Sequence, residues 1–151
     1  MKTEYMIEYD DKEYKKNIPQ KDVVAWVDSV LKKLDKSDYF LSVVFTDNDR
    51  IREINKEFRG KNNETDVLSF SQIEGDDFGF ENKFLGDVVI AVPYTENQAK
   101  ELGHDLFTEV KYLILHGILH LLGYDHDENE EGEMSMLEKK IYNELTGDII
   151  E

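Results

Sequence analysis

The sequence predicts an α/β (α+β) protein, a single domain over residues 1–151 with a small mixed sheet of about four strands packed around a buried central helix. Segments typical of strands and of helices alternate along the chain, which favours this class. The length of 151 residues suits one domain that buries about two-thirds of its unfolded surface. The segment 105–122 is apolar around nearly its whole circumference, which is typical of a buried helix.

The first three expected elements are a strand, a helix and a strand. Residues 4–9 (EYMIEY) predict a short strand. A helix is expected from Pro19, which suits a first turn, to about Lys36, because apolar residues recur there at helical spacing. These residues are Val23, Val27, Val30, Leu31 and Leu34. Residues 39–45 (YFLSVVF) are β-branched and aromatic, so they predict a strand.

A second helix and two strands are expected next. Thr46 or Asp47 can cap the helix, and Gly60 ends it. The apolar face of this helix is predicted to consist of Ile51, Ile54 and Phe58. Residues 66–71 (DVLSFS) and 85–92 (LGDVVIAV) then predict the remaining strands of the sheet.

Three helices are expected to complete the domain. The first begins at Pro93 and ends near Gly103, the second covers about 105–122, and the third covers about 129–145. The third helix is expected to turn Met134, Leu137, Ile141 and Leu145 inward. The resulting order, β-α-β-α-β-β-α-α-α, predicts one α/β domain.

The charge of the protein is strongly negative but unevenly distributed. Thirty-four acidic residues against 18 Lys and Arg give a formal net charge of −16, which works against long-range attraction to nucleic acid. The stretch from Arg50 to Lys61 nevertheless holds five bases and two acids. This stretch can bind a polyanion locally, or it can simply be a solvated helix face.

Cysteine is absent from the sequence, which excludes disulfides and thiolate metal sites and fits a reducing compartment. The start, MKTEYMIEYD, lacks the apolar segment of a signal peptide. The longest run without Asp, Glu, Lys or Arg, residues 112–124, is too short to span a bilayer. We therefore expect a cytoplasmic protein that does not contact a membrane.

The segment HGILHLLGYDH, residues 116–126, has the spacing of metal ligands. His116 and His120 lie one helical turn apart and about 40° apart around the axis, so both imidazoles can reach one ion. Gly123 can take the left-handed conformation that ends a helix, which brings His126 over the same face. Three imidazoles leave one position of a tetrahedral ion open, as in catalytic zinc sites. We predict one Zn²⁺ per chain, bound by His116, His120 and His126.

The residue after the first histidine separates this segment from the zinc peptidases. The general-base Glu of the H-E-x-x-H motif is replaced by Gly117. Glycine inside a helix costs about 1 kcal/mol relative to Ala, so close packing of a strand or a substrate is expected there. Without that carboxylate, phosphodiester cleavage is favoured over peptide hydrolysis. Asp125 can orient His126 or act as a base, and the general base stays unassigned.

A basic stripe follows the helix after Asp47. Arg52, Lys56 and Arg59 recur at i, i+4 and i+7, on a side of the helix away from its apolar residues, and can follow a phosphate backbone. Arg59 lies at the helix end, where its planar guanidinium can bridge two phosphate oxygens. The alternative is that Arg59 only complements the helix dipole or forms a surface ion pair.

The segment 116–126 resembles the H-G-x-L-H-L-x-G-Y-D-H signature of the YbeY family of bacterial rRNA-maturation endoribonucleases, at every fixed position. The segments TDVLSF (65–70) and LGDVVI (85–90) also fit that family. The resemblance implies a zinc-dependent hydrolase that cuts single-stranded RNA in rRNA maturation and ribosome quality control in the cytoplasm. It implies zinc ligation by His116, His120 and His126, a catalytic role for Arg59, and ribosomal small-subunit proteins as partners.

Two alternatives to this function remain open. The protein can be a ribosome-assembly factor whose metal only holds the fold and whose cleavage is weak or needs a partner; the net charge of −16 favours this reading. It can also be a zinc metallopeptidase whose base comes from another position, against which the missing Glu counts strongly.

Overall fold

A mixed four-stranded sheet forms the centre of the protein, as predicted. The structure, a computed structural model, describes residues 6–72, 83–124 and 133–147. Its strands are β1 (Ile7–Tyr9), β2 (Phe40–Thr46), β3 (Val67–Ser71) and β4 (Phe84–Ala91). They lie in the order β1-β2-β4-β3, in which β1, β2 and β4 are parallel and β3 runs antiparallel to β4 at one edge.

The expected helices are present, with small shifts at their ends. They are α1 (Gln20–Lys33), α2 (Asn48–Arg59), α3 (Val92–Leu102), α4 (Leu106–Leu121) and α5 (Glu133–Thr146). The first four expected residues of the last helix, 129–132, lie outside the described residues. A short 3-10 helix, η2 (Lys12–Lys16), was not predicted, because its sequence KEYKK has no apolar periodicity.

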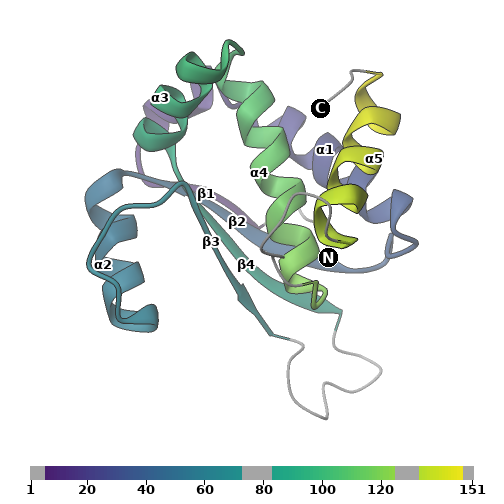
Figure 1. Ribbon diagram of the computed structural model, residues 1–151, viewed down its shortest axis with the longest axis horizontal. Helices are drawn as coiled ribbons and strands as arrows, with labels where there is room; N and C mark the ends of the chain where they lie inside the picture. Colours follow the sequence, from purple (N-terminus) through teal and green to yellow (C-terminus); the bar gives the residue numbers. More distant parts are fainter. Residues whose placement is uncertain (1–5, 73–82, 125–132, 148–151) are drawn as a thin grey trace.

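The two faces of the sheet are covered by different helices (Figure 1). One face packs against α1, α4 and α5, and the alternation of side chains along the strands supplies its apolar contacts. The strand residues of this main core include Leu41, Val43, Phe45, Val88 and Ile90, all fully buried. The other face packs against α2 through a smaller cluster of Ile51, Leu68, Val89 and Ala91.

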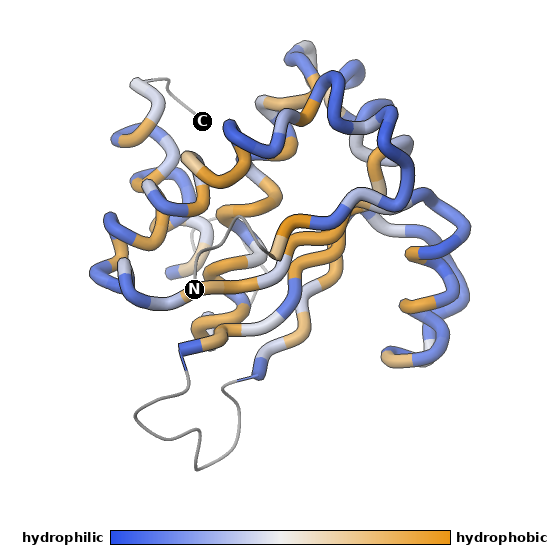
Figure 2. Tube along the Cα trace, turned by 180° about the vertical axis from the view of Figure 1, so that it is seen from behind, coloured by the Kyte–Doolittle hydropathy of each residue, from blue (hydrophilic) through white to orange (hydrophobic). Residues whose placement is uncertain are grey.

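The central helix α4 is buried, as its sequence predicts. Nine of its residues are buried, and the indole of Trp26 on α1 donates a 2.8 Å hydrogen bond to the carbonyl of Lys111 on α4. Figure 2 shows apolar residues concentrated along the strands and the inward turns of the helices, whereas α2 is hydrophilic over most of its length. No helix within the described residues is long and apolar enough to cross a bilayer.

The predicted apolar face of α2 is only partly correct. Ile51 is fully buried and Ile54 is half-buried, but Phe58 at the last turn is 64% exposed. The helix and the edge strand β3 diverge toward the C-terminal end of α2 (Figure 1), so at this turn only long side chains reach the sheet. The divergence leaves an open groove beside Phe58 and Arg59.

Candidate functional site

The first two histidines of the predicted metal motif lie side by side on α4. The ring centroids of His116 and His120 are 4.6 Å apart, with an interplanar angle of 78°, and their Nε2 atoms are 3.2 Å apart. Two imidazole lone pairs repel each other at this distance unless a proton or a cation lies between them. Two zinc–nitrogen bonds of about 2.0–2.1 Å at a tetrahedral angle separate their nitrogens by about 3.3 Å. The pair therefore fits two ligand positions of one zinc ion.

The structure does not test the third predicted ligand. His126 and its neighbour Asp125 belong to residues 125–132, which lie outside the described residues. Within the described ranges, no three His, Asp or Glu side chains are grouped so that they could hold a metal ion. Gly123, which precedes this segment, has the positive φ of 102° that was predicted, and its amide donates a 3.0 Å hydrogen bond to the carbonyl of His120. The helix thus ends where the motif requires a turn.

A buried carboxylate orients the first histidine. Glu138 on α5 is 4% exposed and accepts hydrogen bonds from Nδ1 of His116 and, at 2.8 Å, from the hydroxyl of Tyr112. An ionised carboxylate only accepts hydrogen bonds, so Nδ1 carries the proton and Nε2 presents its lone pair toward His120. Histidines that bind metals commonly donate their other ring N–H to a carboxylate in this way.

Glu138 was not identified from the sequence, although the sequence contains a signal for it. Of the four residues of α5 expected to face inward, Met134 and Ile141 are buried, whereas Leu137 and Leu145 are half-buried. Glu138, four residues after Met134, is buried on the same face. An acidic residue at the centre of an inward stripe needs a buried partner. The hydroxyl of Tyr112 supplies part of that partnership. Burial of the Tyr112 phenol, and to a lesser degree the charge of Glu138, raise the pKa of the phenol well above the ordinary value.

Gly117 allows α4 to approach the sheet closely. A Cβ atom at this position would lie 2.9 Å from both γ carbons of Val88 on β4, a distance that real Cβ atoms essentially never show. Val88 is fully buried and β-branched, so it cannot easily move aside. The expected packing of a strand against Gly117 is therefore observed, and this packing by itself accounts for a glycine next to His116.

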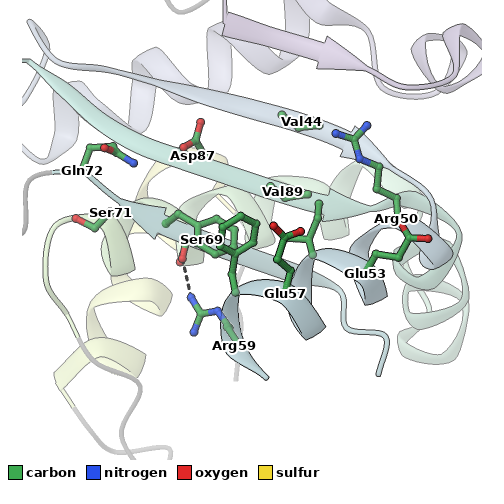
Figure 3. Close-up of a pocket in the computed structure, with 13 residues that line it drawn as sticks. Val44, Arg50, Glu53, Glu57, Arg59, Ser69, Ser71, Gln72, Asp87 and Val89 are labelled. Carbon is green, nitrogen blue, oxygen red and sulfur yellow. Dashed lines mark hydrogen bonds between the residues drawn. The ribbon is translucent and has the colours of Figure 1, made fainter. Parts of the chain in front are cut away.

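Arg59 is held in place at the end of α2 by the edge strand. Its Nη2 donates a 2.7 Å hydrogen bond to the carbonyl of Ser69 on β3 (Figure 3), and its Cζ lies 5.3 Å from the centre of the Phe70 ring. The other arginines of α2 form ion pairs, Arg50 with Asp10 at 2.9 Å and Arg52 with Asp49 at 3.5 Å.

Arg59 itself forms no ion pair with any residue that the structure describes. Among the residues that the structure describes, a surface ion pair therefore does not explain its position. Its guanidinium charge is held beside β3 without a neutralising carboxylate contact in the described part of the chain, which suits the binding of an anion.

Two cavities meet at Arg59. A small cavity of about 140 Å³ lies between the edge strand and α4, and its lining includes Arg59, Ser69, His116, Gly117 and His120. A larger one of about 820 Å³, here named the α2–β3 groove, lies between α2 and the outer face of β3 and β4 (Figure 3). Arg59 and Ser69 line both cavities. The structure thus brings Arg59 from α2 next to the two histidines of α4, which the sequence alone could not show.

Comparison with known proteins identifies relatives of this chain. Residues 7–146 match the family model described as Endoribonuclease YbeY. Two relatives named Endoribonuclease YbeY come from Sulfurihydrogenibium sp. (strain YO3AOP1), 48% identical over 88% of both chains, and from Aquifex aeolicus (strain VF5), 46% identical over 85% of this chain and 83% of the relative. The solution structure of TM1509 from Thermotoga maritima superposes with a TM-score of 0.63 at 29% identity, covering 93% of this chain and 88% of that one.

These matches define the class of protein as that of the endoribonucleases, hydrolases that cut phosphodiester bonds within RNA. Within that class, the chain belongs to the Endoribonuclease YbeY family, whose model covers it from residue 7 to residue 146. The family and the enzyme class expected from the sequence are confirmed, and the metallopeptidase alternative finds no support among these relatives.

Proposed function

We propose that this protein is a zinc-dependent endoribonuclease that cuts single-stranded RNA in rRNA maturation and ribosome quality control in the cytoplasm. The observation that carries the proposal is the position of Arg59, which lines both the cavity of His116 and His120 and the α2–β3 groove. A phosphate that enters from the groove meets an arginine and a pair of metal-ligand side chains within one small space. This combination suits phosphodiester cleavage, in which charge on the phosphoryl oxygens must be neutralised.

The side chains of α4 fit the proposed zinc ion. His116 and His120 present Nε2 atoms 3.2 Å apart, and His126 is proposed as the third ligand. When bound, zinc supplies a Lewis acid and a water molecule whose pKa is lowered toward neutrality. Glu138 keeps the proton of His116 on Nδ1 and fixes the plane of the ring.

Arg59 is proposed to bind the phosphate that is cut. The carbonyl of Ser69 holds one N–H group of its guanidinium and the Phe70 ring lies beneath it, so the side chain is oriented before the substrate arrives. Its remaining N–H groups can donate to two phosphate oxygens, which a lysine cannot do with the same geometry. Because the small cavity is only about 140 Å³ in volume, a flexible single strand can insert a phosphate there more readily than a rigid duplex can.

The charge of the protein supports a ribosomal partner for this activity. A net charge of −16 opposes long-range attraction to RNA, whose affinity for proteins depends mainly on neutralised phosphates. Ribosomal small-subunit proteins, which are proposed here as partners, can bring the rRNA strand to the site. The same charge favours the second candidate, a ribosome-assembly factor whose metal only holds the fold.

Metal analysis combined with RNA cleavage distinguishes these functions. The purified protein is expected to contain about one zinc per chain and to cut a single-stranded RNA oligonucleotide, but not the same sequence in a duplex. A chelator should abolish cleavage, and added zinc should restore it. A folded, zinc-loaded protein that leaves RNA intact even with small subunits present would favour the assembly-factor function.

A further inference from the structure

Phe58 is an exposed aromatic side chain next to the proposed phosphate-binding arginine. It is 64% exposed, although it continues the apolar face of α2 that buries Ile51. Its ring lies against that of Phe70, with centroids 5.6 Å apart and an interplanar angle of 64°. A single exposed apolar residue is ordinary on a protein surface, so its neighbours decide its meaning.

The neighbours of Phe58 connect it to the proposed reaction site. Phe70 contacts Phe58 on one side and has the guanidinium of Arg59 5.3 Å from its ring centre. Phe58, Phe70 and Arg59 all line the α2–β3 groove, and Arg59 continues into the cavity of His116 and His120. The two rings therefore lie next to Arg59, the residue that is expected to bind the phosphate. The groove volume of about 820 Å³ lies in the range of ligand pockets, roughly 300–1,000 Å³.

The charges in the groove indicate which part of a nucleotide it can hold. Besides Arg59, the groove is lined by three carboxylates, Glu53, Glu57 and Asp87, and by one further cation, Arg50 (Figure 3). Arg50 is paired with Asp10, which leaves the three carboxylates as the dominant charges beside the two rings. These carboxylates repel phosphates, so a strand would place its backbone toward Arg59 rather than along the groove. A nucleobase is uncharged, has a flat π-face and carries N–H donors at its edge that carboxylates can accept.

We propose that Phe58, supported by Phe70, stacks an unpaired nucleobase of the RNA strand next to the phosphate bound by Arg59. The inference rests on the proposed function and adds a base-binding position to it. Aromatic side chains are the usual platform for bases of single strands, because every base has a face that can stack. A base that is paired in a duplex cannot stack on Phe58, so this contact would favour single-stranded RNA.

The test compares a short single-stranded RNA with a strand of equal length whose nucleotide next to the cleaved phosphate lacks its base. Both strands carry the same phosphates, so they differ only in the contacts of that base, and the Phe58 variants separate its stacking from its edge hydrogen bonds. Phe58→Ala should weaken binding of the base-bearing strand by roughly five- to a hundredfold and leave binding of the abasic strand unchanged. Phe58→Tyr, which keeps a ring, should restore most of the affinity. Leu102→Ala is the matched control, because Leu102 is 60% exposed on α3 and does not line the groove.

Phe58→Trp gives a direct optical readout. The only native tryptophan, Trp26, is 7% exposed and supplies a constant background. Fluorescence of the new indole should be quenched by the base-bearing strand and not by the abasic strand.

The possible results separate the inference from the function on which it rests. If the wild-type protein cuts RNA but Phe58→Ala binds both strands as the wild type does, the base platform is wrong and the nuclease proposal stands. If Phe58→Ala changes self-association instead of RNA affinity, the ring belongs to a protein interface and the platform is again wrong. If the wild-type protein neither binds nor cuts either strand even with small subunits present, both proposals fail.

Discussion

Glu138 on α5 accepts a hydrogen bond from Nδ1 of His116 on α4, across 22 residues of sequence. The contact fixes the ring of a predicted metal ligand through a buried carboxylate that also binds the hydroxyl of Tyr112. The geometry of the histidine pair therefore depends on the docking of α5 against α4, and not on the spacing within α4 alone.

Glu138→Gln should weaken zinc binding by roughly ten- to a hundredfold, because the neutral amide orients His116 and supports its basicity less well. Competition with a chromogenic chelator measures the affinity, and nitrogen chemical shifts of His116 report which ring atom carries the proton. Glu144→Gln, on the exposed side of the same helix, is the control and should leave both readouts unchanged. Equal zinc affinity in both variants would show that Glu138 only fills space.

Zinc binding should require the histidines of α4 and should depend on pH. Imidazole must be neutral to bind a metal, so zinc occupancy should fall as the pH drops below about 6, near the ordinary pKa of histidine. Elemental analysis of dialysed protein measures this occupancy. A His120→Ala variant that still holds a full equivalent of zinc would refute the assignment.

Arg59→Ala should lower RNA cleavage by roughly 10²–10³-fold while the zinc content and the fold are kept, because it removes a preoriented donor to the phosphate. Arg59→Lys should recover only part of the activity, since a point charge cannot make the bidentate contact. Lys100→Ala, which removes an exposed base on α3 that lines neither cavity, is the matched control. Equal rates of RNA cleavage in the wild type and all three variants would show that Arg59 is only a surface residue.

Gly117→Ala should destabilise the fold by about 1–3 kcal/mol, because the added methyl group overlaps the γ carbons of Val88. Urea unfolding measures the change in the free energy of unfolding. Val88→Ala removes the overlapping atoms, so a double-mutant cycle should show a favourable coupling between the two substitutions. Purely additive effects would mean that position 117 requires a glycine for another reason, such as close approach of the RNA.

Stability should fall in alkaline solution through the phenol of Tyr112. Burial and the charge of Glu138 raise its pKa in the folded protein, whereas in the unfolded chain the value is about 10. The folded state therefore keeps a proton that the unfolded state releases, so this contribution is complete below about pH 10 and is lost as the pH rises further. Urea midpoints between about pH 8 and pH 11 should fall less steeply for Tyr112→Phe than for the wild type. A residual slope should remain from Tyr9, since burial raises its pKa to about 12.

The sequence by itself determined the features that depend on neighbours along the chain. The order of strands and helices, the burial of α4 and the turn at Gly123 follow from local periodicity and local backbone preference. The same is true of His116 and His120, because two residues four apart in a helix face the same side.

Only the tertiary structure decided which distant side chains share the site. It joined Glu138 to His116 and brought Arg59 beside the histidine pair, and it left Phe58 exposed where α2 diverges from the sheet. Helical periodicity shows which side chains share a face, but it does not show how far the neighbouring sheet extends or which helix packs against which. These relationships depend on how α2, α4 and α5 dock on the sheet, because contacts between elements far apart in the sequence have no period of their own.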